Sequence, residues 1–364
     1  MVMRKLKVGI LGATGIVGQT YLRLLENHPF FDVIDVAASP RSAQKTFNEA
    51  VANRWHMSTK IPNNISSLKV RDTNEVESID PNVKLVFSAV NLPNKEEIKK
   101  LELDYARSGI PVISNNSAHR WTEDVPMIIP EINHEHLNVI PIQQRNRGFK
   151  KGFVVVKPNC SIQSYMTPLF ALEQNGFIVE KLIVTTLQAV SGAGYPGVAS
   201  LDIIDNIVPF IGGEEEKSEK EPLKVLGTIN ESGILNRDGL LISATCTRVP
   251  VIDGHTAVVY LKFKDNIPTK EEILKIWRSF HGPPQDLNLP LAPKQPIIYL
   301  SENDRPQPIK DRDLDKGMAV TVGRLREDPI FDYKFVALSH NTIRGAAGGA
   351  ILIGELLYQK NYFD

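Results

Sequence analysis

The residue with the most distinctive chemistry is Cys160, one of only two cysteines among 364 residues. It follows the strand-like run VVVKPN (residues 154–159) and precedes a helix-like pattern. The dipole of a helix N-terminus lowers the pKa of a thiol there, which raises the thiolate fraction near neutral pH. Asn159 is suited to shaping the turn or capping the helix. Since unpaired cysteines are more often packed core residues, Cys160 is either packing or a nucleophile, and mid-strand Cys246 is expected to be packing.

A glycine-rich loop, GILGATGIVG (residues 9–18), lies between a buried strand pattern and an amphipathic helix pattern. Glycines let a backbone turn tightly and approach a pyrophosphate, and the following helix N-terminus supplies N–H donors. The GxxGxxG spacing from Gly12 departs from the standard GxGxxG fingerprint, so the strand–turn–helix context supports the interpretation. We expect a nucleotide here. The alternative is close helix–strand packing without a ligand.

The end of the second expected strand indicates which nucleotide binds. An NAD site usually has an acidic residue there, bonded to the ribose 2′-hydroxyl. This chain instead has ASPRS (residues 38–42), followed by Lys45, and the acidic Asp35 falls earlier, inside the strand. Hydroxyls and cations suit a 2′-phosphate, so we expect NADP. The alternative for Arg41 and Lys45 is a solvated loop.

Thiol chemistry needs an acid or base, and His255 is the best placed of eight histidines. A reactive thiol beside a nicotinamide adds to an aldehyde, and the thiohemiacetal gives up hydride to leave a thioester. His255 and Arg248 are seven residues apart, so an unbroken strand would point them to opposite faces. The turn signal DG (residues 253–254) between them would let both face one cleft. A lone histidine is otherwise more often a satisfied structural residue.

A dense charge run, GGEEEKSEKEPLK, occupies residues 212–224. One interpretation is a solvated helix face with charge pairs four residues apart. The other is an anion-binding lysine held in place by glutamates. Composition does not separate the two.

The elements that must position these residues change character along the chain. Over residues 1–155, strand and helix patterns alternate, which predicts right-handed βαβ units and an α/β domain with a parallel Rossmann-type sheet. Over residues 156–340, long strand patterns with few helices predict an α+β domain with a mixed sheet. The helix expected over 161–176 contains Pro168, which should kink it. The apolar pattern over 341–364 predicts a final helix that completes the first domain.

Composition argues against several classes of partner. Lys+Arg and Asp+Glu both number 42, so net charge gives no indication of nucleic acid or an anionic membrane. No apolar run reaches ~18 residues, and the N-terminus lacks a signal-peptide pattern. Two cysteines at 160 and 246 form no disulfide framework. We therefore expect a cytoplasmic protein with reduced cysteines.

Eight motifs, taken in order, resemble those of aspartate-β-semialdehyde dehydrogenase, most closely its fungal and archaeal branch. They are GATGIVG, ASPRSAQK, SNNSAHR, PNCS, LQAVSGAGYPG, GGEEEKSEKEPLK, RVPVIDGH and SHNTIRGAAGG. The resemblance runs from residue 6 to the C-terminus. Each motif alone is weak, but eight in register are specific.

This resemblance implies a role for each matching residue. Cys160 would be the nucleophile, Gln188 would orient or polarise the substrate, and His255 would be the general acid/base. The implied substrate-binding residues are Asn159, Arg248 for the carboxylate, Glu214 for the amino group, and Arg120 and Lys217 for phosphate. The implied NADP contacts are Gly12, Thr14, Gly15, Ile16, Val17, Ser39, Arg41, Ser42, Ser191, Gly192 and Asn341. No metal is implied, and the three consecutive glutamates (214–216) leave open which one meets the substrate.

The implied reaction is the NADPH-dependent reduction of aspartyl-β-phosphate to aspartate-β-semialdehyde and phosphate, through a thioester on Cys160. It would serve lysine, threonine and methionine biosynthesis. The resemblance also implies a catalytic and dimerisation domain over 156–340, a homodimer or homotetramer, and small-molecule partners only.

Three other functions are alternatives to this one. Malonyl-CoA reductase uses the same cysteine chemistry and shares SGAGYPG, RGAAGG and the nucleotide loop, but Asn159 and the EEEKSEKE segment argue against it. N-acetyl-γ-glutamyl-phosphate reductase is a more distant rival. An inactive NADP-binding regulator need not keep Cys160, Arg248 and His255 together, and this chain has all three.

Overall fold

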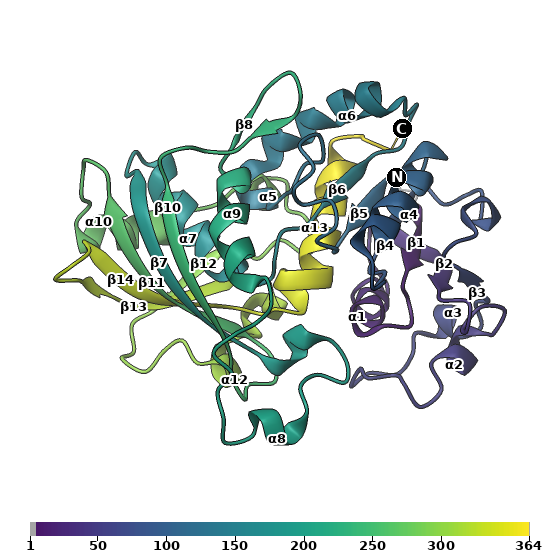
Figure 1. The fold of residues 1–364 in the computed structure, drawn as a ribbon, viewed down its shortest axis with the longest axis horizontal. Helices are drawn as coiled ribbons and strands as arrows, with labels where there is room; N and C mark the ends of the chain where they lie inside the picture. The colour runs from purple at the N-terminus through teal and green to yellow at the C-terminus, as the bar shows by residue number, and fades with distance from the viewer. Residues whose placement is uncertain (1–4, 364) are drawn as a thin grey trace.

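The computed structural model describes residues 5–363 as two sheet-based layers side by side, with one long helix between them (Figure 1). The strands of the first sheet are β1 (Leu6–Leu11), β2 (Phe31–Ala38), β3 (Val70–Asp72), β4 (Leu85–Ser88), β5 (Val112–Ser114) and β6 (Val154–Val156). They pair in parallel throughout, in the order β3-β2-β1-β4-β5-β6. Buried runs such as LVFS are typical of a parallel sheet covered on both faces. The predicted Rossmann-type sheet is confirmed.

Helices and short loops connect these strands. The helices are α1 (Ile16–Leu24), α2 (Phe47–Ala50), α3 (Asn63–Ser66), α4 (Lys95–Arg107), α5 (Pro130–Asn133) and α6 (Ile140–Arg147), with 3₁₀ turns at 76–78 and 134–139. The turn between β1 and α1 has Gly12 at φ +77°, and a Cβ there would lie 2.5 Å from the carbonyl oxygen of Ala89. Only glycine fits this turn without moving the backbone.

The second sheet is mixed, as predicted. Across the sheet its strands are β10 (Leu241–Arg248), β7 (Val179–Gln188), β11 (His255–Phe263), β14 (Tyr333–Ser339), β13 (Val320–Glu327) and β12 (Ile297–Leu300). The pairs β10–β7 and β12–β13 are parallel, and the other three pairs are antiparallel. A separate two-stranded ribbon joins β8 (Thr228–Ile229) and β9 (Ile234–Leu235).

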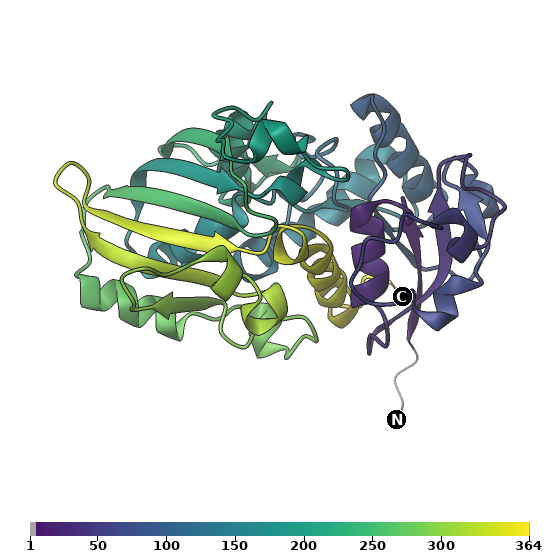
Figure 2. The same cartoon turned by 90° about the horizontal axis from the view of Figure 1, so that it is seen from below.

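The helices of this second layer are α7 (Gln163–Gln174), α8 (Ser200–Ile203), α9 (Glu214–Val225), α10 (Lys270–Ser279), α11 (Pro283–Asp286) and α12 (Pro308–Asp311), with 3₁₀ turns at 190–193 and 314–317. α7 and α10 pack on one face of the sheet (Figure 2). α7 continues through Pro168 as a single helix, so the expected kink does not divide it. The carbonyl oxygen of Pro168 accepts the indole N–H of buried Trp277 at 3.0 Å.

The last helix, α13 (Gly348–Gln359), follows a π-helical turn at 343–347 and lies between the two layers (Figure 1). Its residues 348–357 are all buried. Gly354 brings it against the first sheet, because a Cβ there would lie 3.0 Å from Cζ of Phe87. The C-terminal helix therefore packs against the first sheet, and it spans only part of the 341–364 range expected to be helical. Among residues 5–363, no helix combines the length and apolarity needed to cross a membrane.

Candidate active site

Cys160 lies between β6 and α7, at the carboxyl edge of the first sheet. Ligands of open α/β sheets bind outside this edge. Oδ1 of Asn159 accepts the N–H of Ser161 at 2.8 Å, and this Asx turn sets the backbone around the cysteine. α7 begins only at Gln163, so Asn159 shapes the turn and does not cap the helix.

The thiol faces a histidine from the second layer. Sγ of Cys160 lies 3.4 Å from Nε2 of His255, the first residue of β11. Nδ1 of His255 accepts the backbone N–H of Ala189 at 3.0 Å. A neutral imidazole whose Nδ1 accepts a hydrogen bond carries its proton on Nε2, so the ring faces the sulfur as a donor. Burial, followed by the charge of Arg248, lowers the pKa of His255 to about 3, which keeps the ring neutral.

The pKa of the thiol moves in the direction opposite to the one expected from the sequence. Desolvation by the surrounding protein, followed by the charge of Glu214, raises the pKa of Cys160 to about 11. The expected lowering by the helix dipole is therefore wrong for this chain. The cysteine lies three residues before α7 begins, and it retains only partial exposure to solvent. Lys157, Arg120 and Lys217 act in the lowering direction, with smaller effects.

The structure brings Arg248 and His255 together, although they are seven residues apart. Arg248 ends β10, His255 begins β11, and the turn between them directs both side chains toward Gly192. A Cβ on Gly192 would lie 2.8 Å from Nη1 of Arg248 and 3.0 Å from Cε1 of His255. Arg248 is buried, and its Nη1 donates to the carbonyl oxygen of Ala189 at 2.8 Å. Gly192 thus leaves the space in which the two side chains meet.

The charge run forms α9, and its two faces match the two interpretations of the sequence. On the outer face, exposed Glu216 pairs with Lys220 at 2.8 Å, four residues on. On the inner face, Oε1 of buried Glu214 accepts Nζ of Lys217 at 2.7 Å. Glu214 is also the member of the 214–216 triplet that is buried, so it is the one aimed at the cysteine turn.

Glu214 collects polar groups from three elements. Its Oε1 accepts Nδ2 of Asn159 at 3.1 Å, and its Oε2 accepts Nε2 of Gln188, the last residue of β7, at 3.2 Å. Lys217 and the hydrogen bonds lower its pKa against the effect of burial, so the carboxylate is ionised. Cys160 thus lies near an anion, a buried guanidinium and an imidazole.

The side chain of Arg120 also contacts the segment that leads to Cys160. Its Nη1 donates to Oε1 of Glu221 at 2.9 Å, its Nε to the carbonyl oxygen of Lys157 at 3.0 Å, and its Nη2 to that of Asn115 at 3.1 Å. The side chain is buried. Three of its five N–H groups are thereby engaged within the protein.

A cavity of about 590 Å³ opens beside the glycine loop. Its lining includes Thr14, Gly15, Ile16, Val17 and Arg41, together with residues 193–195 of the second layer. Its size is typical of sites for small molecules and cofactors. The tight glycine turn, the start of α1 and the exposed guanidinium fit a dinucleotide with a 2′-phosphate.

Other expected cofactor residues lie outside this lining. Gly12 forms the turn itself, and the N–H of buried Ser42 donates to the carbonyl oxygen of Ser39 at 2.9 Å. Asp35 is buried in β2 and forms a two-pronged ion pair with Arg71, with a shortest contact of 2.9 Å. It is therefore occupied and unavailable to a ribose hydroxyl, as its position within the strand suggested.

Ser191 and Asn341 bind each other. Nδ2 of Asn341 donates to Oγ of Ser191 at 2.8 Å, and Oδ1 of Asn341 accepts the N–H of Gly254 at 2.8 Å. Together they hold the returning C-terminal segment beside the turn that carries His255. That they also contact NADP stays a prediction.

Several residues near the site were not found by reading the sequence. The cavity is also lined by Arg54, His56, Asn91, Asn115 and Asn116. The ring of His56 stacks on Tyr195 across the two layers, with centroids 3.7 Å apart. No local pattern marks residues 54 and 56. Gly345 lies in the RGAAGG motif, so the sequence could have indicated it. A Cβ on Gly345 would lie 2.8 Å from Cβ of Cys160.

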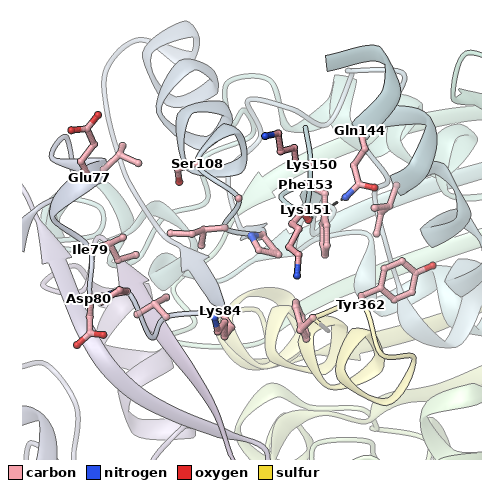
Figure 3. Close-up of a pocket in the computed structure, with 18 of the residues that line it drawn as sticks. Glu77, Ile79, Asp80, Lys84, Ser108, Gln144, Lys150, Lys151, Phe153 and Tyr362 are labelled. Carbon is pink, nitrogen blue, oxygen red and sulfur yellow. Dashed lines mark hydrogen bonds between the residues drawn. The ribbon is translucent and has the colours of Figure 1, made fainter. Parts of the chain in front are cut away.

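A second cavity, of about 690 Å³, lies at the opposite, amino-terminal edge of the first sheet (Figure 3). Its lining includes Lys84, Lys151, Phe153 and Tyr362. None of the expected site residues contributes to it. The glycine loop with its cavity and the turn that carries Cys160 both lie at the carboxyl edge, which is therefore the candidate active site.

Comparison with known proteins agrees with this geometry. A family model described as the NAD binding domain of semialdehyde dehydrogenase matches residues 7–140, and one described as its dimerisation domain matches residues 169–344. Aspartate-semialdehyde dehydrogenase of Aspergillus fumigatus is 44% identical over 364 residues, with 98% of both chains covered. That of Methanothermobacter thermautotrophicus is 45% identical over 352 residues, covering 96% of this chain and 98% of the relative.

Solved structures give the same result. The crystal structure of aspartate semialdehyde dehydrogenase with NADP from Candida albicans has a TM-score of 0.89 and 38% identity, and 99% of this chain and 100% of that chain are covered. Aspartate semialdehyde dehydrogenase II from Vibrio cholerae has a TM-score of 0.75 and 26% identity, with 98% and 99% covered. On these grounds the chain belongs to the aspartate-semialdehyde dehydrogenase family.

Proposed function

We propose that the chain catalyses the reversible NADPH-dependent reduction of aspartyl-β-phosphate to aspartate-β-semialdehyde and phosphate. The observation that carries this proposal is the contact of 3.4 Å between Sγ of Cys160 and Nε2 of His255, beside a glycine-loop cleft. Relatives 44% and 45% identical over nearly the whole chain are named for this enzyme. The product feeds lysine, threonine and methionine biosynthesis.

Acyl transfer is the first step in the reductive direction. The sulfur of Cys160 attacks the acyl carbon and a C–S bond forms. The C–O bond to phosphate breaks with its electron pair on phosphate, and the thiol proton leaves with the phosphate. The Nε2–H of His255 donates toward the sulfur and stabilises the thiolate. The product of this step is a thioester on Cys160.

Hydride chemistry is supplied by NADPH when it is bound, at the thioester carbon. The oxyanion that forms at the carbonyl oxygen accepts a hydrogen bond from the Nε2–H of His255, while its carbon stays bonded to the Cys160 sulfur as the anion of a thiohemiacetal. When the oxyanion collapses, the C–S bond breaks with its electron pair on sulfur, the aldehyde and the Cys160 thiolate are released, and the thiolate regains a proton from solvent. Because burial lowers the pKa of His255 to about 3, the ring stays neutral and acts on the thiolate and the oxyanion through its Nε2–H as a hydrogen-bond donor.

Charged groups around the thiol would recognise the substrate. We assign Arg248 to the substrate carboxylate and Glu214 to its ammonium group, with Gln188 and Asn159 orienting the acyl carbon. Arg120 and Lys217 are assigned to phosphate, since a guanidinium fork and an ammonium both bind phosphate oxygens. For the cofactor, Arg41 is assigned to the 2′-phosphate of NADP.

We also propose a homodimer or homotetramer that assembles through the open face of the second sheet. This face carries Ile183, 37% exposed, and Leu241, 66% exposed, on neighbouring strands. The match to a dimerisation domain over 169–344 supports this assignment. Size-exclusion chromatography with light scattering tests it, and Ile183→Lys should shift the protein toward monomer.

A cytoplasmic location is proposed because Cys160 and Cys246 are both free.

The first experiment measures NADP reduction by the purified protein with aspartate-β-semialdehyde, with and without phosphate, beside a reaction that contains NADPH and malonyl-CoA. Phosphate-dependent turnover of the semialdehyde alone is expected. Activity on malonyl-CoA alone would keep the cysteine chemistry and refute the phosphate site around Lys217. No turnover in either reaction, with NADP still bound, would favour the inactive regulator.

A further inference from the structure

We propose that Glu221 is a positioning residue of the reaction, because one of its carboxylate oxygens holds the cysteine turn and the other holds the guanidinium of Arg120. The inference rests on the proposed function and deepens it. Glu221 is not among the residues expected to bind the substrate, but it contacts two of them, Asn159 and Arg120.

Each carboxylate oxygen of Glu221 accepts a different hydrogen bond. Oε2 accepts the backbone N–H of Asn159 at 2.5 Å, and Oε1 accepts Nη1 of Arg120 at 2.9 Å. Glu221 lies on the inner face of α9, two helical turns after Glu214. Its side chain is 0% exposed. A carboxylate that is fully buried must be paired and hydrogen-bonded, and both requirements are met by these two contacts.

The first contact acts on the residue immediately before the nucleophile. Asn159 is held at three points: its backbone N–H by Glu221, its Nδ2 by Glu214 at 3.1 Å, and its Oδ1 by the N–H of Ser161 at 2.8 Å. The orientation of this peptide determines where the next side chain points. Removing the Glu221 contact therefore frees Cys160 to move relative to His255.

The second contact acts on the proposed phosphate ligand. Arg120 is tied to the ends of β6 and β5 through the carbonyl oxygens of Lys157 and Asn115. Glu221 supplies the negative charge that a buried guanidinium needs, and it fixes the rotation of the fork.

Replacing Glu221 with glutamine keeps the size of the side chain but exchanges one acceptor oxygen for an NH₂ donor. That donor must face either the N–H of Asn159 or the N–H of Arg120, so one of the two hydrogen bonds is lost. A displacement of about 1 Å at a reacting atom costs about 100-fold in rate. We expect kcat to fall by about 10- to 100-fold and KM for phosphate to rise several-fold. KM for NADP should stay within about twofold, because Glu221 does not line that cleft.

Wild type, Glu221→Gln and the matched control Glu216→Gln are assayed for phosphate-dependent NADP reduction with the semialdehyde. The control makes the same chemical change on the same helix, at an exposed residue paired with Lys220. A general loss of packing would change both Michaelis constants, whereas positioning predicts a rise for phosphate alone. Equal kcat and equal KM for phosphate in Glu221→Gln and the control would overturn the inference.

A further variant covers the case in which Glu221→Gln does not fold. Glu221→Asp keeps the charge but is one methylene shorter, so it cannot reach both Asn159 and Arg120. It should fold, bind NADP and show reduced kcat; wild-type kinetics in this variant would also overturn the inference. Absence of turnover in wild type would overturn the proposed function itself, and this inference with it.

Discussion

Replacing Glu214 with glutamine should make Cys160 react faster with iodoacetamide while catalytic turnover falls. The charge of Glu214 is the second cause, after desolvation, of the raised pKa of the thiol, which is about 11. With that pKa, the thiolate fraction at about pH 8 is about 10⁻³, and each pKa unit removed makes labelling about tenfold faster. Glutamine retains the volume of glutamate and removes the charge. Lys217 then loses its partner, and its own charge lowers the pKa of the thiol further.

The assay follows the iodoacetamide labelling rate of Cys160 by mass spectrometry across a range of pH. In wild type, the logarithm of the rate should rise by about one unit per pH unit, without a plateau between about pH 7 and pH 10. In Glu214→Gln the same profile should move to lower pH. Cys246, which is 0% exposed, serves as an unreactive internal reference. Glu216→Gln is the matched control and should leave the profile unchanged.

Two results would refute this reasoning. A wild-type plateau with a midpoint below about pH 8 would show a thiolate–imidazolium pair, and the neutral pair inferred for Cys160 and His255 would be wrong. Labelling of Glu214→Gln at or below the wild-type rate would show that the carboxylate does not act on the thiol through its charge. Loss of turnover accompanied by faster labelling separates binding of the substrate from reactivity of the nucleophile.

Four other changes test single residues. Cys160→Ala should still bind NADP in a fluorescence titration but lose nearly all turnover, and normal turnover would exclude a thioester. Lys217→Met should chiefly raise KM for phosphate, and an unchanged value would leave the lysine as part of a solvated face. Arg41→Ala should weaken NADP more than NAD when both dissociation constants are measured, whereas equal losses would place Arg41 in a solvated loop. The folded pKa of His255 lies below its ordinary value of 6.5, at about 3, so its contribution to stability is present above pH 6.5 and is lost as pH falls toward 3. His255→Gln should therefore melt with a weaker acid dependence in that window, and an unchanged dependence measured by calorimetry would contradict the lowered pKa.

The features that the sequence predicted correctly depend on local pattern. The glycine turn at Gly12, the parallel first sheet and the mixed second sheet follow from residue periodicity and from conformations that only glycine adopts. The pKa of Cys160 was predicted in the wrong direction because the position of a helix is a local property, whereas desolvation is produced by residues far along the chain. Which of the glutamates 214–216 is buried likewise depends on where α9 begins, because a shift of one residue rotates the buried face by about 100°.

Pairings across long sequence separations were beyond the reach of sequence patterns. Glu221 and Arg120 are 101 residues apart, and Ser191 and Asn341 are 150 apart. Each residue type, taken alone, is common on a protein surface. Their pairing is determined by the way α9 and the C-terminal segment return to the edge of the first sheet.

A nucleophile kept neutral in the free protein is consistent with the proposed chemistry, because the same carboxylate that raises its pKa is assigned to the substrate ammonium. Binding of that ammonium would offset the charge of Glu214, so the pKa of Cys160 would fall when the substrate arrives. Glu214→Gln reproduces this offset permanently, which is why it should label faster and yet turn over more slowly. The thiol would then be least reactive toward other electrophiles when no substrate is present. α9 connects these effects, since Glu214 adjusts the charge near the sulfur and Glu221 fixes its place opposite His255.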